Sequence, residues 1–323
     1  MNPGWQPTFD LPESTTLSLP GRGTTELWDS GEPERVTTSA STPSSAFSFG
    51  KEPSTFDLDD TGVANEEPPA ATSLPVLLLH GWNIDARTNY GFAFAHLAQS
   101  HRVVMYDQHG HGNGPRHGGV FSLEDAANDA ITILDALDIP RAIILGYSLG
   151  GAVAQTLAHN HRERCAGLVL SATSGRFSQT RREAAEFFIL ARTARVLRRI
   201  PPAARSAAFT AILSIATKKY PEWIANVVRN GDPISLLEAG ASLGTFDSST
   251  WNDLSTIPSS FVITSNDVIV PKRRQVDLAT QLDVASLHSI AAGHEVPILN
   301  DNAFSSALAA AVGEVVDETR VAH

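Results

Sequence analysis

The sequence has few of the features that mark a secreted or membrane-spanning chain. Cys165 is the single cysteine among 323 residues, so no disulfide can form within the chain, and a reducing compartment such as the cytoplasm is expected. No uncharged apolar run approaches the roughly 18 residues that a membrane span requires. The first basic residue is Arg22, and no basic region precedes an apolar core near the N-terminus, so no secretory signal is expected.

Basic charge is also scarce. The formal net charge is −11 at pH 7, and residues 1–73 carry most of it, with twelve acidic and three basic side chains. Residues 74–323 are almost neutral. Since no basic patch is available to displace counterions from phosphates, nucleic acid is not expected as a partner. The length allows a substantial core, either in one large α/β domain with an insertion or in two medium domains.

The N-terminal part of the chain combines a patterned and an unpatterned segment. Residues 1–31 are predicted to be an extension that ends in a β-hairpin of the core, because two alternating segments flank the turn at 20–23. Residues 32–73 are mostly Ser, Thr, Pro, Glu and Asp, with no period of 2 or 3.6. Such a segment buries too little apolar area to offset its ordering entropy, so a disordered acidic insertion is predicted. A solvated linker and a regulatory docking segment both fit this composition.

Apolar runs without alternation begin at Leu74. Such runs are typical of strands that helices cover on both faces. They alternate here with helical segments, which predicts an α/β fold with a doubly wound, mostly parallel sheet. The first part of this core is assigned to residues 74–176. Its strands are expected at 75–79, 102–106, 142–145 and 167–172, and its helices at 91–100, 122–138 and 152–161.

Residues 177–253 interrupt the alternation and are predicted to be an inserted helical cap over the strand ends. Its helices are expected at 181–199, at 203–219 and from about 221 onward. The first of them has a basic face formed by Arg192, Arg195, Arg198 and Arg199. Such a face fits either a solvated helix or a helix that lies on a membrane surface.

The second part of the core is assigned to residues 254–323. Strands are expected at 260–264 and 286–290, and helices at 272–282 and 303–316. Residues from Asp317 onward are expected to be frayed.

The central motif is G-x-S-x-G over residues 146–150, between an apolar strand and a helix. Glycines on both sides are required because a serine at the apex of such a turn has a strained backbone conformation. β-Carbons at the neighbouring positions would collide with the adjoining strand and helix. The Ser148 hydroxyl is therefore predicted to be an exposed nucleophile. The amide of Leu149, at the start of the helix, is predicted to stabilise the oxygen that becomes negative.

A nucleophilic serine needs a base and a carboxylate that orients the base. Asp267 and His294 each follow one of the last two predicted strands, and strands of a parallel sheet share one carboxyl edge. The order Ser, Asp, His also fits the motif. Asp247 and Asp253 are the alternative acids.

Trp82 follows the first central strand and is predicted to give the second oxyanion amide. Trp82 and Tyr147 are the two candidates for substrate binding; no other residue is assigned to it. His109 and His111 form H-x-H beside Asp107, but no further ligands follow at zinc-like spacing, so neither a metal nor a cofactor is predicted.

Five sequence blocks together resemble the α/β-hydrolase superfamily. They are HGW at 80–82, DQHGHG at 107–112, GYSLGG at 146–151, NDVIVP at 266–271 and GH at 293–294. The resemblance covers residues 14–31 and 74–316. Within the superfamily, the chain most resembles the group of serine esterases, lipases and haloperoxidase-like enzymes with a helical cap. Two departures are Ser265, where relatives usually have glycine, and the acidic insertion.

The resemblance implies a hydrolase, and the residues narrow the reaction. Epoxide hydrolases and haloalkane dehalogenases of this fold use an aspartate where this chain has Ser148, and no HGGG-type loop follows the first central strand. Hydrolysis of a small-molecule carboxylic ester through an acyl-enzyme is the leading prediction. Carbon–carbon bond hydrolysis, thioester hydrolysis and acyl transfer use the same triad. A ligand receptor without catalysis is the alternative from another class. The sequence leaves the oligomeric state open.

Overall fold

The computed structural model describes residues 7–33, 73–201, 204, 222–299 and 302–321. Within them, eight strands form one sheet in the order β1-β2-β4-β3-β5-β6-β7-β8. The strands are β1 (Thr15–Leu19), β2 (Gly23–Asp29), β3 (Val76–Leu79), β4 (Val103–Tyr106), β5 (Ala142–Tyr147), β6 (Cys165–Ser171), β7 (Ser259–Thr264) and β8 (Ser286–Ile290).

Strand pairing confirms the predicted α/β class. β1 and β2 form the antiparallel hairpin expected near the N-terminus, and β2 joins the sheet antiparallel to β4. From β4 to β8 every pair of neighbouring strands is parallel. The carboxyl ends of these strands therefore lie at one edge of the sheet.

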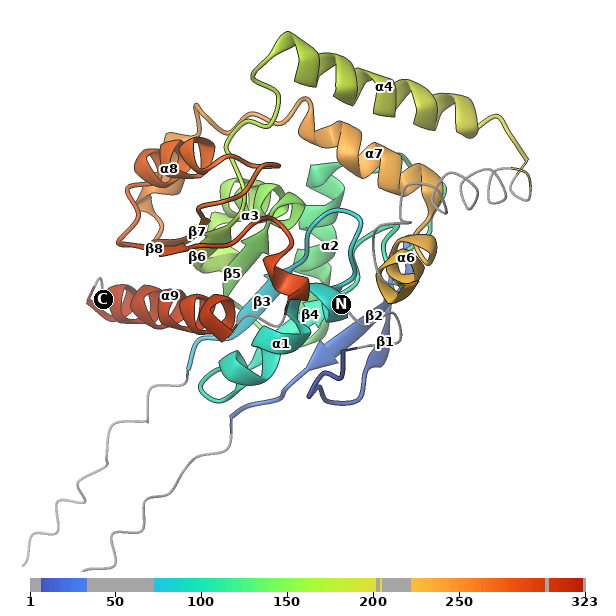
Figure 1. Cartoon of the computed structure of the whole chain (residues 1–323). Helices are drawn as coiled ribbons and strands as arrows, with labels where there is room; N and C mark the ends of the chain where they lie inside the picture. The colour runs from blue at the N-terminus through green and yellow to red at the C-terminus, as the bar shows by residue number, and fades with distance from the viewer. Residues whose placement is uncertain (1–6, 34–72, 202–203, 205–221, 300–301, 322–323) are drawn as a thin grey trace, which may run out of the picture.

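Helices cover both faces of the sheet (Figure 1). α1 (Ala86–Ala98) and α9 (Asn302–Val321) contact each other on one face. α2 (Leu123–Ala136) and α3 (Leu149–Asn160) contact each other on the other face, where α8 (Lys272–Gln281) also packs. The two apolar layers explain why β3 and β5 are buried at every position and show no alternation.

Helix starts follow capping side chains. Ser122 caps α2, because its hydroxyl accepts a hydrogen bond from the Asp125 amide at 3.0 Å, as the sequence predicted. Asp85 caps α1 in the same way, through the Thr88 amide at 2.7 Å. The helix predicted to start near Gly91 therefore begins five residues earlier, at Ala86, directly after this cap.

Three described helices lie between β6 and β7, in the segment predicted to be a cap. They are α4 (Arg181–Leu197), α6 (Glu222–Arg229) and α7 (Pro233–Leu243). Thr180 and Glu183 form a capping box that starts α4. α4 packs along α7 and is the outermost helix of this segment (Figure 1). The helix predicted at 203–219 and the predicted disordered insertion at 32–73 lie almost entirely outside the described residues.

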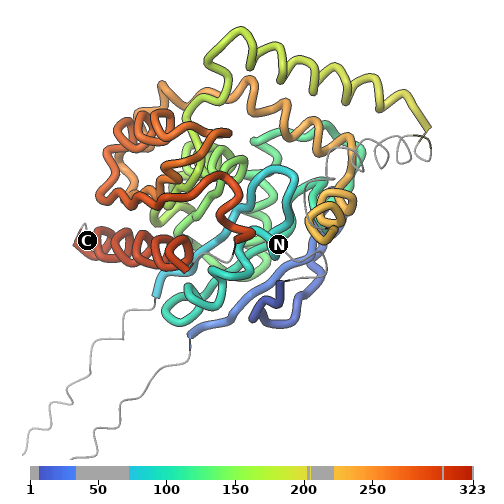
Figure 2. The backbone as a smooth tube through the Cα atoms, in the orientation of Figure 1, coloured from blue at the N-terminus to red at the C-terminus, as the bar shows by residue number. Residues whose placement is uncertain are grey.

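The C-terminal helix is longer than predicted. Fraying from Asp317 was wrong, because α9 continues to Val321. Asp317 pairs with Arg320 at 3.6 Å, and no proline or glycine follows that would end the helix. Figure 2 shows the chain running through this helix along the side of the molecule. Short 3-10 turns complete the described elements: η1 (Arg162–Arg164), η2 (Asn252–Thr256) and η3 (Val296–Ile298).

Candidate active site

Ser148 lies in the sharp turn between β5 and α3. Its backbone has φ 53° and ψ −114°, a conformation that L-residues rarely adopt. A Cβ at Gly150 would collide with the Leu79 carbonyl, and one at Gly146 would collide with the Gly150 carbonyl. Strand and helix can therefore approach this closely only because both positions are glycine.

The structure brings the three predicted residues together at the carboxyl edge of the sheet. The Ser148 Oγ lies 3.0 Å from Nε2 of His294, and Nδ1 of the same ring lies 2.7 Å from Oδ2 of Asp267. An ionised carboxylate can only accept, so Nδ1 carries the proton and Nε2 is left to accept from the Ser148 hydroxyl. This is the geometry that a base needs to remove the serine proton.

The Asp267 carboxylate is buried and receives four donors. Oδ2 accepts from His294 and from the Thr264 hydroxyl at 2.9 Å, and Oδ1 accepts from the amides of Ile269 and Val270 at 2.8 and 2.9 Å. Burial alone would raise the pKa of Asp267, but the His294 hydrogen bond and charge, with the smaller contributions of Val270 and Thr264, lower it below its ordinary value. Asp267 is therefore ionised at neutral pH.

Ser265 does not disturb this turn. The φ angle of Ser265 is not positive, so the glycine that relatives usually have here is not required. Its amide donates to the Ile290 carbonyl at 2.9 Å, which extends the pairing of β7 with β8 by one residue.

The two alternative acids have other partners. Asp247 forms an ion pair with Arg176, and that hydrogen bond is the main cause that lowers its pKa to about 2. Asp253 lies 2.8 Å from Nδ1 of His159. Neither of them contacts His294, so the structure brings only Asp267 to the predicted base.

Tyr147 has a contact that the sequence did not reveal. Its hydroxyl donates to the backbone carbonyl of His294 at 2.6 Å and ties the loop after β8 to the end of β5. The side chain also lines the cavity beside His294. Sequence alone could not predict the bond, because it joins residues 147 positions apart through a main-chain atom.

Two amides near Ser148 are free to bind an oxyanion. Within the described part of the chain, neither the Leu149 N–H nor the Trp82 N–H has a hydrogen-bond acceptor. Asn89 supports the loop that carries the second amide, since its Oδ1 accepts from the Gly81 N–H at 2.8 Å. The Trp82 indole donates to the Leu236 carbonyl of α7 at 2.7 Å, so the side chain also joins this loop to the cap.

A cavity of about 420 Å³ adjoins His294. Most of its described lining is apolar, with contributions from α6 and from the loops after β3, β7 and β8. Its aliphatic lining includes Ile84, Ile224, Val227, Val268, Ile269 and Ile298. Among the described lining residues, Glu295 is the single carboxylate, and none is lysine or arginine. The cavity therefore suits an uncharged apolar group.

The H-x-H segment forms a buried turn. Nδ1 of His111 lies 3.0 Å from the His109 carbonyl, and Oδ2 of Asp107 accepts from the Asn113 amide at 2.7 Å. Burial is the main cause that lowers the pKa of His109 to about 3 and that of His111 to about 4, so both rings are neutral at pH 7. Across the ranges that the structure describes, no three His, Cys, Asp or Glu side chains are arranged to hold a metal ion.

The predicted basic face of α4 includes one arginine that is engaged within the protein. Arg198 donates to both oxygens of Glu238, at 2.6 and 2.8 Å, and to the carbonyls of Gly118 and Gly119. Arg192, Arg195 and Arg199 are exposed. None of the helices in the described ranges combines the length and the hydropathy that a membrane crossing requires.

Comparison with known families agrees with this architecture. The sequence pattern of the alpha/beta hydrolase fold matches residues 75–301. A solved hydrolase from Pseudomonas aeruginosa PA01 has a TM-score of 0.65 at 19% identity, and the alignment covers 93% of this chain and 98% of that one. A thermophilic esterase from Thermogutta terrifontis has a TM-score of 0.64 at 21% identity, covering 94% and 99%.

Curated relatives match in shorter stretches. A 2-hydroxymuconate semialdehyde hydrolase of Pseudomonas sp. (strain CF600) is 32% identical over 117 residues, which are 35% of this chain and 41% of that protein. A poly(3-hydroxyalkanoate) depolymerase of Ectopseudomonas oleovorans is 27% identical over 249 residues, 74% of this chain and 85% of that protein. The chain spans less than half the length of the first curated relatives it matches.

Proposed function

The chain belongs to the alpha/beta hydrolase fold family, and from this premise we propose that it is a serine hydrolase that cleaves carboxylic esters of small molecules through an acyl-enzyme. The observation that carries the proposal is the hydrogen-bonded chain from Ser148 through His294 to Asp267, on a strained turn that only glycine neighbours permit. Names of relatives such as a poly(3-hydroxyalkanoate) depolymerase and a methyl ester esterase are consistent with ester chemistry.

In the proposed reaction, Ser148 attacks the ester carbonyl while His294 takes its proton. The amides of Leu149 and Trp82 donate to the oxygen that becomes negative. The protonated His294 then gives its proton to the alcohol, which leaves the acyl group on Ser148. A water molecule then attacks the acyl group, with His294 acting first as base and then as acid, and the carboxylic acid is released from Ser148. Asp267 keeps the ring in the required tautomer and stabilises its positive charge.

The lining of the cavity favours an uncharged acyl group. Glu295 would repel an anionic substrate, and the described lining residues offer no lysine or arginine to bind one. One relative is named a 2-hydroxymuconate semialdehyde hydrolase, so carbon–carbon bond hydrolysis is the second candidate. A muconate-type substrate carries a carboxylate, which this cavity does not favour.

The proposed location is the cytoplasm. Its support is the single cysteine, since a chain without disulfides fits a reducing compartment. The proposed partner is a small-molecule acyl substrate.

Two esters of matched length test the proposed chemistry and the charge preference together. p-Nitrophenyl hexanoate is uncharged, whereas the p-nitrophenyl monoester of glutaric acid carries a carboxylate at the far end. We expect kcat/KM to be at least about tenfold higher for the uncharged ester, as one unfavourable charge contact in a largely apolar site implies. Ser148→Ala should abolish turnover of both. A folded protein that hydrolyses neither ester but cleaves a diketone acid would overturn the ester proposal.

A further inference from the structure

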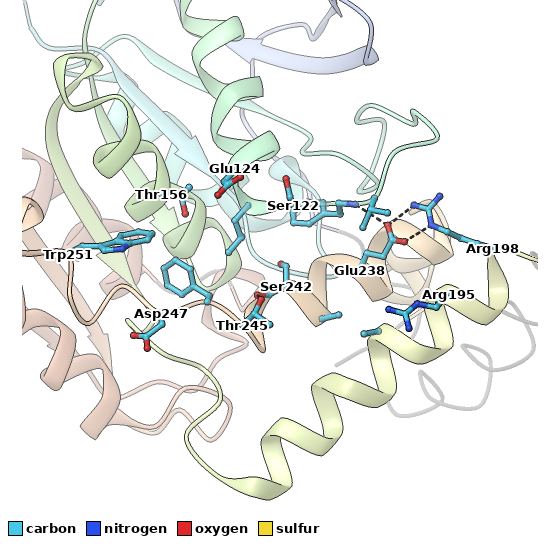
Figure 3. A pocket seen from close by; sticks show the side chains of 16 residues that line it. Ser122, Glu124, Thr156, Arg195, Arg198, Glu238, Ser242, Thr245, Asp247 and Trp251 are labelled. Atoms are coloured by element: carbon cyan, nitrogen blue, oxygen red, sulfur yellow. Dashed lines mark hydrogen bonds and ion pairs between the residues drawn. The ribbon is translucent and has the colours of Figure 1, made fainter.

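A second cavity, of about 610 Å³, lies on the far side of α7 from Trp82. Its size is within the range typical of small-molecule sites. The walls come from α4, from α7 with the loop that follows it, and from the start of α2 (Figure 3). No residue in its described lining also lines the cavity beside His294.

Helix α7 separates the two cavities. On one side, a Cβ at Gly240 would lie 2.5 Å from the Trp82 indole, and the Leu236 carbonyl accepts the indole N–H. On the other side, Glu238, Ala241 and Ser242 line the second cavity. A molecule in this cavity is therefore separated by α7 from the cavity beside His294.

One end of the second cavity is aromatic. Phe246 and Trp251 pack edge to face with ring centroids 5.7 Å apart, and Trp251 also stacks on His159. Figure 3 shows Trp251 and Thr156 at this end, and Arg195 and Arg198 at the opposite end. The Thr156 hydroxyl is already bonded to the Ala152 carbonyl at 2.9 Å. The aromatic end therefore offers mainly apolar contact.

At the opposite end, one positive charge has no counter-charge among the residues that the structure describes. Arg198 is neutralised by Glu238, and the Asp247 carboxylate near the aromatic end is neutralised by Arg176. Arg195 also lines the cavity, and its guanidinium has no hydrogen bond or ion pair with any residue that the structure describes. A guanidinium of this kind binds a carboxylate with two parallel hydrogen bonds.

A second charge, which forms no ion pair with any residue in the described ranges, would favour one orientation of an anionic ligand. Glu124 lies in the first turn of α2, on the wall opposite α4 (Figure 3). It would repel an anionic head group from that wall and so leave Arg195 as the place for it.

We infer that this cavity binds an amphipathic organic carboxylate, with its head group on Arg195 and its apolar body against Phe246 and Trp251. The ligand contacts α4, α7 and the start of α2 at once, and so it links the outermost helix to the core. This inference does not depend on the proposed esterase activity, because its test measures binding.

The probe is 11-(dansylamino)undecanoate, a fluorescent carboxylate with a long apolar body, titrated into the full chain. The alcohol with the same chain is the uncharged control. We expect saturable binding of one carboxylate per chain. Arg195→Gln should raise its Kd at least about tenfold, as the loss of a charged hydrogen bond implies, whereas Arg192→Gln on the exposed face of the same helix should not.

A variant that fills the cavity gives the second measurement. Ala241→Phe places a large side chain in the second cavity and should remove binding of the probe, while circular dichroism reports whether the variant is folded. The inference is overturned by any of four results. These are no saturable binding to the natural chain, equal affinity for the alcohol, equal loss in Arg192→Gln, or binding that persists in a folded Ala241→Phe variant.

Discussion

Four donors converge on the Asp267 carboxylate, and this convergence explains why its charge is stable where the side chain is fully buried. At the scale of single residues, a buried carboxylate without such donors would take up a proton instead. The ionised form is what keeps the His294 ring in the tautomer that can accept from Ser148. Both the reactivity of the site and part of its pH dependence therefore follow from one side chain.

Asp267→Asn tests this role by activity and by stability. We expect kcat to fall on the order of 10⁴-fold, because the amide favours the wrong histidine tautomer. The folded pKa of Asp267 lies below its unfolded value, so the carboxylate stabilises the fold above about pH 4, and this stabilisation is lost as the pH falls. The difference in unfolding free energy between natural chain and variant should therefore shrink from pH 6 to pH 3. Urea unfolding across this range measures it, and a constant difference would contradict the account.

We propose that Tyr147 positions His294, since its hydroxyl donates to the backbone carbonyl of that residue. Tyr147→Phe removes one buried hydrogen bond and keeps the ring that lines the cavity. We expect kcat to fall about tenfold with little change in KM, which corresponds to one lost bond of roughly 1.4 kcal/mol. A variant with unchanged kcat and a raised KM would show that the hydroxyl binds substrate instead.

At the level of helices and strands, sequence patterns predicted where the strands and α4 lie, but not the contacts that α4 makes. β3, β5, β6 and β7 each contain an apolar run without alternation, so burial on both faces can be predicted for them without any tertiary information. The start of α2 could be predicted from Ser122, because a capping hydrogen bond joins residues that are close in sequence. The contacts of α4 could not be read in this way, because they join Arg198 to a carboxylate forty residues later and to two backbone carbonyls.

The pair of Arg198 and Glu238 attaches α4 to α7 and to the loop before α2. The Glu238 side chain is 8% exposed and the Arg198 side chain 31%, so the pair is partly shielded from water. Arg198→Met leaves the Glu238 carboxylate with the Phe121 amide as its remaining described donor. We expect a loss of about 1–3 kcal/mol in unfolding free energy, between the values of exposed and buried pairs.

Arg192→Met is the matched control for this change. Arg192 is exposed on the same helix and has no partner among the residues that the structure describes. Thermal or urea unfolding of both variants should show a loss for Arg198→Met alone. If the unfolding free energy falls equally in the two variants, or in neither, the pair of Arg198 and Glu238 does not stabilise the cap.

Across the fold, the candidate site exists only when the strands from β5 to β8 are paired. Ser148 follows β5, whereas Asp267 and His294 follow β7 and β8, and β6 pairs with both β5 and β7. Four strands must therefore reach their native register before the residues meet. The order of these three residues in the chain, and the strand that precedes each, predicted that they lie together, since parallel strands share one carboxyl edge. The cavity volumes were not predictable, because they depend on how helices of the cap rest on the core.

The most direct test of the central claim is covalent labelling of the native protein with a fluorophosphonate, followed by peptide mapping. We predict one labelled residue, Ser148, because its hydroxyl lies 3.0 Å from Nε2 of His294, and Nδ1 of the same ring is bonded to the Asp267 carboxylate. Labelling should be strongly reduced in His294→Ala and absent in urea, where the strands no longer bring the two residues together. Labelling of another residue, or no labelling of a folded sample, would contradict the assignment of Ser148 as the nucleophile.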